Sequence, residues 1–595
     1  MTARDLLSSV AEASTDTEFY TPMPAGYKPG KTKYVGVFGT VMSGLGKGIF
    51  ASSLAKVLKD KGLTVAPIKL EGYLNLDSGT LNPYRHGEVF VLDDGMECDM
   101  DLGTYERMLD QDMTRQNFTT SGQIFTAVLE KERRGGYLGR DVQMIPHVTG
   151  EVKSKLRRLA VDSDADVVFI EIGGTVGDVE NAYYIEALRQ LAFEEGPGST
   201  CWVALTYILQ PPSLGEQKSK AAQLGIRQLT QSGIQPHIIA CRAIHPVTDQ
   251  TREKIALYSS VPIERVFSMH DCESVYVIPE MAREAGLDRA VVDILGVGSR
   301  VHPEAEQAAR QTWRAYLASL RGAGDAVRIG IAGKYTSVRD SYASVIKALE
   351  HGGTRCGVRV EIDWIDTTDL KAGEEPNANT AVRERLNHLH GLIVPGGFGT
   401  RGAEGKIACI RHARTTGLPY LGLCLGFQLA VIEYARHVCG LAGAGSTEFD
   451  AACPVPVIDI LPEQKQIEGL GGNMRLGGRD VVLRPGTLVA RLFNNAPETR
   501  LRFRHRYEVD PRYVDRLGDA GLIFSGKAPD YPIMQVLELP ADVHPFFIAT
   551  QAHPELTSRP LRPDPFFLGL VTASVERAGT GRHARAAHPG ARDAS

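Results

Sequence analysis

The chain contains the segment Pro419-Tyr420-Leu421-Gly422-Leu423-Cys424-Leu425-Gly426-Phe427-Gln428. Its first half is apolar and predicts a buried strand, and apolar residues at helical spacing from Leu425 to Arg436 predict a helix. Cys424 therefore falls at a sharp turn from strand to helix, where the glycines on both sides allow a tight backbone. The start of the helix presents free N–H groups and a positive dipole end, which favour a thiolate. The pattern predicts a nucleophile elbow.

Two distant segments supply the partners that a cysteine nucleophile needs. His553-Pro554-Glu555 offers an imidazole as a base and a carboxylate to orient it. Leu392–Gly399 is a short apolar strand that enters a glycine-rich turn, where backbone N–H groups can converge on an oxyanion. A lone cysteine between leucines is usually a core residue, and Pro-Gly-Gly alone is simply a loop. The three segments together indicate a catalytic relay.

These three segments resemble the class I (triad) glutamine amidotransferase domain. The resemblance implies that Cys424 attacks the side-chain amide of glutamine, that His553 is the base, and that Glu555 orients the imidazole. It places the oxyanion hole around Gly397 and implies a pocket in which a carboxylate and a guanidinium meet the charged ends of glutamine. The implied pocket residues are Leu425, Gly426, Phe427, Gln428, Glu448 and Arg506. The product of such a domain is ammonia, which another part of the chain must use.

The composition is that of an ordinary globular protein with more than one domain. At 595 residues the chain is too long for a single core. With 43% apolar residues, 23% charged residues and a net charge of −5, it has no basic excess to suggest nucleic acid. We expect no membrane span and no signal peptide. The nine cysteines are scattered without a CxxC pair, which favours a reducing cytoplasm.

Strand-like runs alternate with helical periods, which predicts α/β domains with mostly parallel sheets. We expect a flexible leader over 1–31, a first domain over 32–298, a linker over 299–326 that contains a helix (Pro303 to Leu320), a second domain over 327–577 and a disordered tail over 578–595. The strands expected in the first domain are Tyr34–Phe38, Val65–Leu70, Val167–Ile172, Val203–Leu209 and Ile238–Cys241, with a helix over Gly48–Lys61; the second domain starts with a strand at Val327–Ile331.

The first domain carries a glycine-rich turn with one lysine. Gly39-Thr40-Val41-Met42-Ser43-Gly44-Leu45-Gly46-Lys47-Gly48-Ile49 follows a strand and precedes a helix, so backbone N–H groups and Lys47 can cradle a polyphosphate. It departs from the strict GxxxxGK[ST] pattern at Gly48. Glu171 ends an apolar strand, where a carboxylate without a function would be costly, and Asp101 lies in an acidic turn. These two are candidate Mg²⁺ ligands.

Over nearly its whole length the chain resembles the CTP synthase family. The family fold implied is a dethiobiotin-synthetase-like P-loop domain with a mostly parallel sheet, the amidoligase domain, followed by the amidotransferase domain. The matching segments are Ser43–Ile49, His86–Val91, Lys131–Gly135, Ile145–His147, Glu171–Glu180 and Asn473–Gly477.

The resemblance implies an ATP-dependent reaction in two steps. ATP phosphorylates the 4-oxygen of UTP, and ammonia from the second domain displaces the phosphate to give CTP. The residues implied for ATP are Gly44, Leu45, Gly46, Lys47, Gly48, Ile49, Lys69, Asp101, His270, Asp271 and Cys272, with Asp101 and Glu171 for Mg²⁺. Those implied for UTP or inhibitory CTP are Ser43, Asp178, Val179, Glu180, Lys218, Ser219, Lys220, Ala221, Ala222, Gln223 and Lys254. His86 is expected near the ammonia gate, GTP as activator, and a homotetramer that also forms filaments in the cytoplasm.

The sequence departs from the family pattern near the pyrimidine end. Lys69-Leu70-Glu71-Gly72-Tyr73 replaces Lys-Leu-Asp-Pro-Tyr, and Lys218–Gly225 loses the small polar and rigid residues of Lys-Thr-Lys-Pro-Thr-Gln-His-Ser. Two alternatives therefore stay open: a feedback-altered CTP synthase, or a paralogue that aminates another 4-oxo pyrimidine nucleotide. A non-catalytic filament or regulatory homologue would have lost a triad member, Lys47, Asp101 or Glu171, and all of these are present. A cobyrinate-type amide synthase would lack the segments at 86–91 and 171–178.

Overall fold

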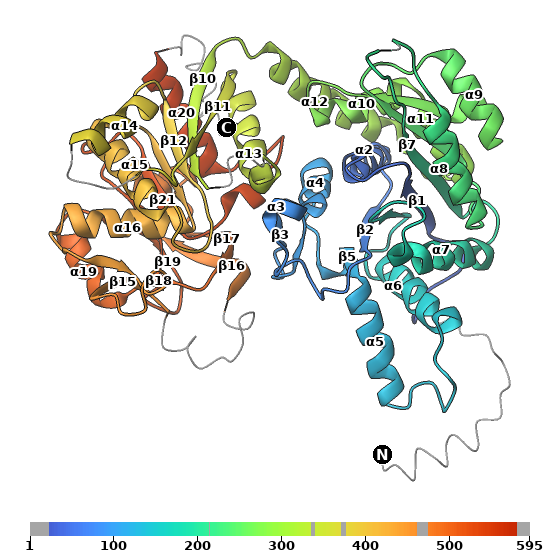
Figure 1. The fold of residues 1–595 in the computed structure, drawn as a ribbon, viewed down its shortest axis with the longest axis horizontal. Coiled ribbons are helices and arrows are strands. Elements are labelled where there is room, and N and C mark those ends of the chain that lie inside the picture. Colours follow the sequence, from blue (N-terminus) through green and yellow to red (C-terminus); the bar gives the residue numbers. More distant parts are fainter. Residues whose placement is uncertain (1–22, 214, 335–338, 371–375, 461–473, 580–595) are drawn as a thin grey trace, which may run out of the picture. The chain divides into compact units, whose positions relative to one another are not determined.

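The computed structural model describes residues 23–213, 215–334, 339–370, 376–460 and 474–579. The chain divides into two compact units (Figure 1): the first is Met1–Thr80 with Thr104–Arg314, and the second is Leu81–Gly103 with Ala315–Ser595. Most of the expected leader, residues 1–22, and nearly all of the expected tail, residues 580–595, lie outside the described residues. No helix within the described ranges is long and apolar enough to cross a membrane.

The first unit is built on a seven-stranded parallel sheet in the order β5-β2-β6-β1-β7-β8-β9. This confirms the predicted parallel α/β fold. The strand predicted at Val203–Leu209 runs instead over Thr200–Tyr207, because Thr200 already pairs with Tyr34. The strands are β1 (Lys33–Gly39), β2 (Val65–Glu71), β5 (Phe118–Thr120), β6 (Val167–Ile172), β7 (Thr200–Tyr207), β8 (Ile238–Ala243) and β9 (Val266–His270).

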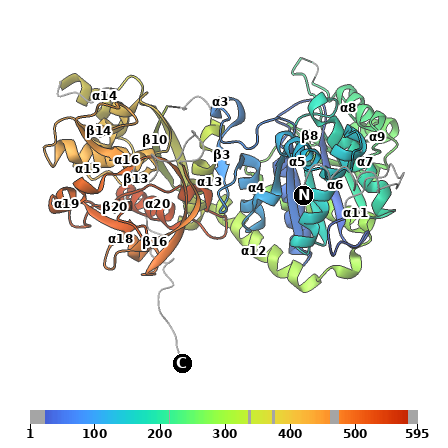
Figure 2. The ribbon, with the colours of Figure 1, turned by 90° about the horizontal axis from the view of Figure 1, so that it is seen from below.

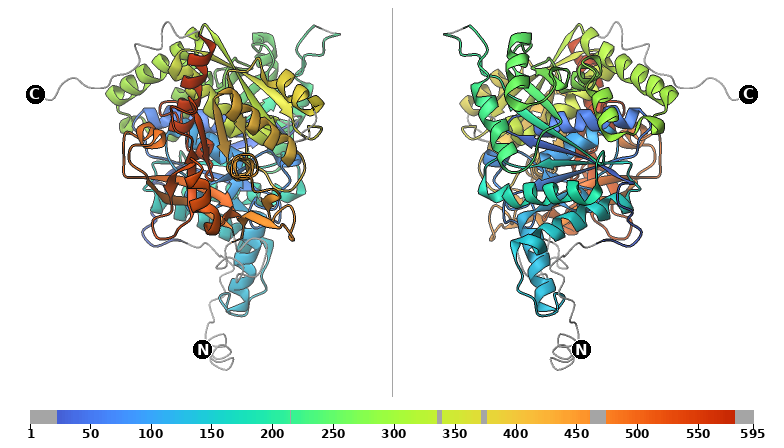
Figure 3. Two further views of the ribbon diagram at one scale, coloured as in Figure 1. Left: turned by 90° about the vertical axis from the view of Figure 1, so that its left-hand side faces the viewer. Right: turned by 90° about the vertical axis from the view of Figure 1, so that its right-hand side faces the viewer.

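Helices cover both faces of this sheet (Figures 1 and 3). One continuous apolar core joins alternate strand residues such as Tyr34, Ile68 and Ile170 to helices that include Leu156 and Leu188. The helices that belong wholly to this unit are α2 (Lys47–Asp60), α5 (Ser121–Arg133), α6 (Thr149–Asp162), α7 (Ala182–Glu195), α8 (Lys220–Gln231), α9 (Asp249–Ser259), α10 (Ile278–Glu284) and α11 (Leu287–Leu295). Two more, α4 (Met100–Leu109) and α12 (Pro303–Gly322), cross the boundary between the units.

The second unit has a nine-stranded sheet in the order β11-β10-β12-β13-β21-β20-β19-β16-β17. The strands from β11 to β21 are parallel, and the remaining four are antiparallel. These strands are β10 (Ala326–Gly333), β11 (Arg359–Asp366), β12 (Gly391–Val394), β13 (Tyr420–Leu423), β16 (Arg475–Leu483), β17 (Glu498–His505), β19 (Ile523–Lys527), β20 (Met534–Glu538) and β21 (Phe547–Thr550). A small sheet adds β14 (Ala444–Ser446), β15 (Val455–Asp459) and β18 (Glu508–Val509).

Successive residues of the central strands point to opposite faces of this sheet, and each face packs into its own apolar core. Leu392 and Val394 pack with α15 and α16, whereas Ile393 and Leu421 pack with α13 and α20. Figure 2 shows these helices around the sheet. The helices of the unit are α13 (Ala343–Cys356), α14 (Pro376–Leu386), α15 (Ala403–Thr416), α16 (Leu425–His437), α18 (Leu488–Leu492), α19 (Pro511–Asp519) and α20 (Pro565–Ala578).

The segment Leu81–Gly103 belongs to the second unit although it precedes most of the first unit in the sequence. It contains the short helix α3 (Pro83–His86) and the hairpin of β3 (Val89–Val91) and β4 (Glu97–Asp99). Three arginines of β17 bind the hairpin: Arg500 pairs with Asp93 at 2.9 Å, Arg502 donates to the carbonyl of Val91, and Arg504 pairs with Glu97 at 2.7 Å. The sheet of the second unit thus binds the segment Leu81–Gly103, which lies far earlier in the sequence.

The expected helix between the domains is confirmed as α12. Its first part is bound to the first unit by Trp313, which is buried and donates its indole N–H to the carbonyl of Tyr276 at 3.0 Å. Glu280 accepts from both Arg310 and Arg314 on the same helix. This part of the connection is therefore rigidly packed.

Candidate active site

Cys424 lies at the turn from β13 to α16, as the sequence predicted. Its backbone angles, φ 50° and ψ −99°, are strained for a residue with a side chain, and it occupies the N-cap position of α16. The turn is tight because α16 approaches β12 closely: a Cβ on Gly426 would lie 2.1 Å from the carbonyl oxygen of Val394. The Cys424 N–H donates to the carbonyl of Thr550 at 2.8 Å, which fixes the elbow to β21.

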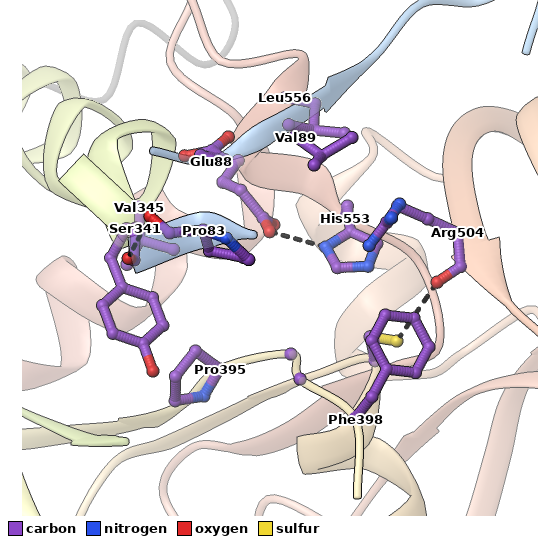
Figure 4. A pocket seen from close by; sticks show the side chains of 15 residues that line it. Pro83, Glu88, Val89, Ser341, Val345, Pro395, Phe398, Arg504, His553 and Leu556 are labelled. Carbon is purple, nitrogen blue, oxygen red and sulfur yellow. Dashed lines mark hydrogen bonds and ion pairs between the residues drawn. The ribbon is translucent and has the colours of Figure 1, made fainter. Parts of the chain in front are cut away.

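His553 and Glu555 follow β21 and line the same cavity as Cys424. Figure 4 shows the His553 ring at this cavity. His553 Nδ1 is 2.7 Å from Glu555 Oε1. Burial alone would lower the pKa of His553, but the charges of Glu555 and Cys424 and hydrogen bonds to both outweigh burial and raise this pKa well above its usual value. The geometry is that of a nucleophile, a base and a carboxylate that orients the base.

The turn that was predicted to form the oxyanion hole lies next to Cys424, His553 and Glu555. A Cβ on Gly396 would lie 2.9 Å from His553 Cε1 and 3.5 Å from the Cys424 Cβ, so only glycine fits there. Lys334 donates to the carbonyl of Phe398, and Gly399 N donates to Glu448 Oε1 at 2.7 Å, which fixes the far end of the turn. The turn is held next to the nucleophile before any substrate arrives.

Cys424, His553, Glu555 and the turn line one cavity of about 110 Å³. Figure 4 shows Pro83, Glu88 and Val89 of the segment Leu81–Gly103 on its wall. Glu88 is held there because its Oε2 accepts from Ser344 N at 2.7 Å. His86, predicted near an ammonia gate, is exposed and does not line this cavity.

Some of the residues predicted to bind glutamine have side chains in the apolar core, and others have polar side chains near the elbow. Leu425 and Phe427 point into the core, so only their backbones face the elbow. Gln428 is buried and donates to the carbonyl of Tyr507 at 3.1 Å and to Gln551 Oε1 at 3.3 Å. Burial raises the pKa of Glu448, against the bond from Gly399 and the charges of Lys334 and Arg506. Glu448 and Arg506 are therefore close enough to interact electrostatically. This is expected of two groups that bind the opposite charges of one zwitterion.

Two polar side chains that interact with Cys424 were not predicted from the sequence. Gln551 Nε2 lies 3.6 Å from Cys424 Sγ, and only its position two residues before His553 hinted at a role. Lys406 on α15 is buried, and burial, aided by Lys334, lowers its pKa to about 7 against the opposing effects of Cys424 and Cys409. Nothing in the pattern of α15 separates Lys406 from an exposed lysine.

The predicted phosphate loop connects β1 to α2 in the first unit. Gly44 and Gly46 have φ of 70° and 79°, which turns the chain into the N-terminus of α2 at Lys47. The Lys47 side chain is buried, and its Nζ donates to the carbonyl of Gly174 at 2.5 Å, at the end of β6. Lys69 pairs with Glu171 at 2.5 Å. Two cations therefore lie at the carboxyl ends of neighbouring parallel strands, where nucleotides bind in such sheets.

A second cavity, of about 270 Å³, adjoins this loop. Its wall brings together predicted ATP residues from two distant segments, Leu45, Gly46 and Ile49 from the loop, and His270, Asp271 and Cys272 from the end of β9. Arg242, at the end of β8, was not predicted. It donates to the carbonyl of Gly44 and to Asp271, both at 3.2 Å, and so joins the two segments.

The residues predicted for the pyrimidine nucleotide differ in burial. Those that are exposed are Ser43, Asp178, Val179, Glu180, Lys220 and Lys254, those that are half-buried are Lys218, Ala221 and Gln223, and those that are buried are Ser219 and Ala222. Lys218 precedes α8, Lys220 begins it, and Lys254 lies on α9, which packs against α8. A hydrogen bond from Lys218, its charge and, more weakly, Lys254 lower the pKa of Glu216. Ala222 is buried in the core, so its side chain has no access to a ligand. Asp178 accepts from Thr175 N at 2.6 Å, and Val179 and Glu180 are exposed.

The two predicted metal ligands are carboxylates in different surroundings. Glu171 is fully buried, with Oε1 on Lys69 and Oε2 on the Tyr105 hydroxyl at 3.1 Å. Asp101 is half-buried in the first turn of α4. The described residues contain no group of three or more His, Cys, Asp or Glu that could hold a metal ion. A site with few carboxylates suits Mg²⁺, which takes further oxygens from substrate phosphates and water.

Comparison with known proteins agrees with this geometry. Residues 33–297 match the family model "CTP synthase N-terminus", and residues 337–573 match "Glutamine amidotransferase class-I". The CTP synthase of Thermococcus gammatolerans is 46% identical over 92% of this chain and 99% of its own. A CTP synthase of Thermus thermophilus is 45% identical over 93% of this chain and 98% of its own. A solved glutaminase domain of Trypanosoma brucei CTPS with bound acivicin is 36% identical, with a TM-score of 0.39, and covers 42% of this chain and 94% of that one.

Both family models lie in the expected order, and relatives at about this identity align along nearly their full length. The nucleophile elbow, the histidine and glutamate beside it and the phosphate loop are in the positions that the sequence pattern predicted. The chain belongs to the CTP synthase family.

Proposed function

We propose that this protein is a glutamine-hydrolysing CTP synthase, which uses ATP to aminate UTP with ammonia released from glutamine. One observation carries the proposal: a single chain holds a Cys-His-Glu trio at a nucleophile elbow and a phosphate loop beside a cavity of nucleotide-binding type. Full-length relatives that combine the same two domains are named CTP synthase. The enzyme is thus a C–N ligase with glutamine as the amide donor.

In the amidotransferase domain, one proton moves between Cys424 and His553. The thiol proton passes to His553, and the thiolate attacks the amide carbon of glutamine. The N–H groups of the turn around Gly397 stabilise the negative oxygen that forms. His553 returns the proton to the departing ammonia, and water then hydrolyses the thioester. Glu555 supports the imidazolium throughout, in keeping with the raised pKa of His553. Glu448 and Arg506 would hold the two charged ends of the substrate.

In the nucleotide half, Lys47, Lys69 and the N–H groups of the loop would hold the phosphates of ATP. The cavity beside Leu45 and Cys272 is lined largely by apolar side chains, among them Phe50, Met269 and Ile278, as a site for a base would be. The oxygens of Glu171 fit a hard divalent cation, and Asp101 is the second expected ligand. Bound Mg²⁺ would neutralise phosphate charge during transfer to the 4-oxygen of UTP. Lys218, Lys220 and Lys254 supply the cations that a triphosphate requires.

UTP is the substrate that these three lysines favour, with CTP as a feedback inhibitor at Asp178–Glu180 and GTP as an activator. A homotetramer that assembles into filaments completes the proposal. The alternative of another 4-oxo pyrimidine nucleotide rests on five residues that differ from the family pattern, Glu71, Gly72, Ala221, Ala222 and Leu224. Of these, Glu71 pairs with Lys69 at 3.3 Å. The carboxylate of Glu71 therefore lies beside a cation that is expected to bind ATP.

A substrate screen with ammonia as the nitrogen source tests this assignment. The protein is incubated with ATP, Mg²⁺, ammonium chloride and one pyrimidine nucleotide at a time, UTP, dUTP, UDP or dTTP, and products are separated by chromatography. We expect CTP from UTP at the highest kcat/KM. Efficient amination of another nucleotide, with no CTP from UTP, would show that the substrate is wrong while the class of reaction holds.

A further inference from the structure

The sulfur of Cys424 has two polar contacts of opposite kind besides His553. The carbonyl oxygen of Arg504 lies 3.7 Å from Sγ and can only accept a hydrogen bond, as Figure 4 shows. Gln551 Nε2 lies 3.6 Å from Sγ and can only donate one. The first contact favours the protonated thiol, and the second favours the thiolate. The nucleophile is therefore placed between a group that holds its proton and a group that stabilises its charge.

The direction of the Gln551 amide follows from a backbone carbonyl. The carbonyl of Tyr507 accepts only, so the atom of Gln428 that faces it at 3.1 Å must be the NH₂ group. The same NH₂ group lies 3.3 Å from the Gln551 side chain, which must therefore present its oxygen there. The remaining end of Gln551, toward Cys424, is its NH₂ group. The amide cannot be turned around without breaking this series of hydrogen bonds.

Gln551 is also held rigidly. It is completely buried, and its backbone N–H donates to the carbonyl of Gln535 at 2.8 Å. The preceding residue, Thr550, accepts from the backbone N–H of Cys424, so donor and sulfur are fixed to the same strand end. Gln551 does not line the cavity that Cys424 and His553 share, and it thus leaves that side of the sulfur to a substrate. A donor fixed before reaction costs no reorganisation when charge develops.

We propose that Gln551 is a further catalytic residue of the glutamine-hydrolysing site, whose side-chain N–H stabilises the negative charge on Cys424 Sγ. The charge arises when the thiol proton moves to His553, and again when the thioester breaks and the sulfur leaves. The amide keeps both of its own protons in each step. Through Gln428 the same series of hydrogen bonds reaches the carbonyl of Tyr507, the neighbour of Arg506. The proposal rests on the glutamine hydrolysis proposed above.

The test compares Q551L with a matched control, Q535L. Leucine removes the donor and nearly keeps the volume. Gln535 is also a buried glutamine, on the adjacent strand β20, and the backbone carbonyl that accepts from Gln551 N–H at 2.8 Å is retained in leucine. Alkylation of Cys424 by iodoacetamide is followed against pH by mass spectrometry of its peptide, because only the thiolate reacts. For Q551L we expect the profile to move to higher pH and the rate at pH 7 to fall about 10- to 100-fold. Q535L should follow the wild type.

Steady-state kinetics give a second readout that a merely structural role would not produce. Q551L should lower kcat for glutamine hydrolysis with little change in KM, and keep amination from ammonium chloride. Q551N, which retains a buried amide but is too short to reach the sulfur, should behave as Q551L does and covers the case in which leucine prevents folding. Alkylation profiles of Q551L and Q551N that match the wild type would overturn the proposal. A wild type that is alkylated normally but hydrolyses no glutamine would instead refute the proposed function.

Discussion

At the scale of single residues, the site depends on a balance at His553. Burial lowers the pKa of this imidazole, while Glu555 at 2.7 Å and the charge on Cys424 raise it more strongly. A raised pKa keeps the imidazolium present to higher pH, where it can protonate departing ammonia. Its charge contributes stability that is present at low pH and is lost as pH rises through the raised value. We therefore expect Glu555 to set the alkaline limit of glutamine hydrolysis.

Replacing Glu555 with glutamine should move that limit. Without the carboxylate charge, burial is opposed only by Cys424, so the pKa of His553 falls and the imidazolium is lost at lower pH. We expect the alkaline limb of kcat/KM for glutamine hydrolysis to shift to lower pH, with activity at pH 8 reduced by about 10²-fold or more. Amination from ammonia serves as the control and should keep the pH profile of the wild type. An unshifted alkaline limb would mean that Glu555 does not support the imidazolium.

At the scale of elements, β17 has two distinct faces. Leu501, Phe503 and His505 point into the core, and Arg500, Arg502 and Arg504 point to the hairpin of β3 and β4. The Arg504 guanidinium also lies 5.3 Å from the ring of Phe398 in the oxyanion turn. One strand therefore binds the hairpin and supports the turn beside Cys424.

The two ion pairs to the hairpin should differ in strength. The side chains of Arg504 and Glu97 are 18% and 9% exposed, whereas those of Arg500 and Asp93 are 49% and 38% exposed. Breaking the buried pair with E97Q leaves a charge poorly solvated, and the exposed pair is weak in water. We expect amide exchange over Val89–Asp99 to accelerate roughly 10- to 100-fold in E97Q and only a few-fold in the matched variant D93N. Equal acceleration would contradict a special role for the Arg504 pair.

The elements that could be predicted are those with local signals. The elbow at Cys424 and the loop before Lys47 each combine an apolar strand, glycines and a helix within about a dozen residues. The strand predicted at Val203 was displaced because its start is set by pairing with β1, which no local pattern records. Gln551 and Arg242 form hydrogen bonds to residues more than a hundred positions away, Cys424 and Gly44. Local sequence therefore gave no sign of Arg242, and for Gln551 only the nearby His553.

At the scale of the whole molecule, the chain combines a synthase domain and an amidotransferase domain, each with its own sheet and core. Chain order alone does not divide them, because the segment Leu81–Gly103 leaves the first unit and packs on the amidotransferase sheet. That segment could not be predicted, since its contacts with β16 and β17 span about 400 positions. It contributes Pro83, Glu88 and Val89 to the cavity of Cys424. Residues 83, 88 and 89 fall within the match to the CTP synthase N-terminus model and yet line the cavity of the glutamine-hydrolysing site.

Ammonia made at Cys424 is expected to be consumed elsewhere in the same chain, and the nitrogen source of CTP formation in C424A shows whether it is. CTP formation from UTP and ATP is compared for the wild type and C424A, with glutamine or with ammonium chloride as the nitrogen source. The wild type should form CTP from both. C424A should form none from glutamine and keep close to the wild-type rate with ammonium chloride, because the substitution removes only the nucleophile. Equal loss with both nitrogen sources would contradict the account.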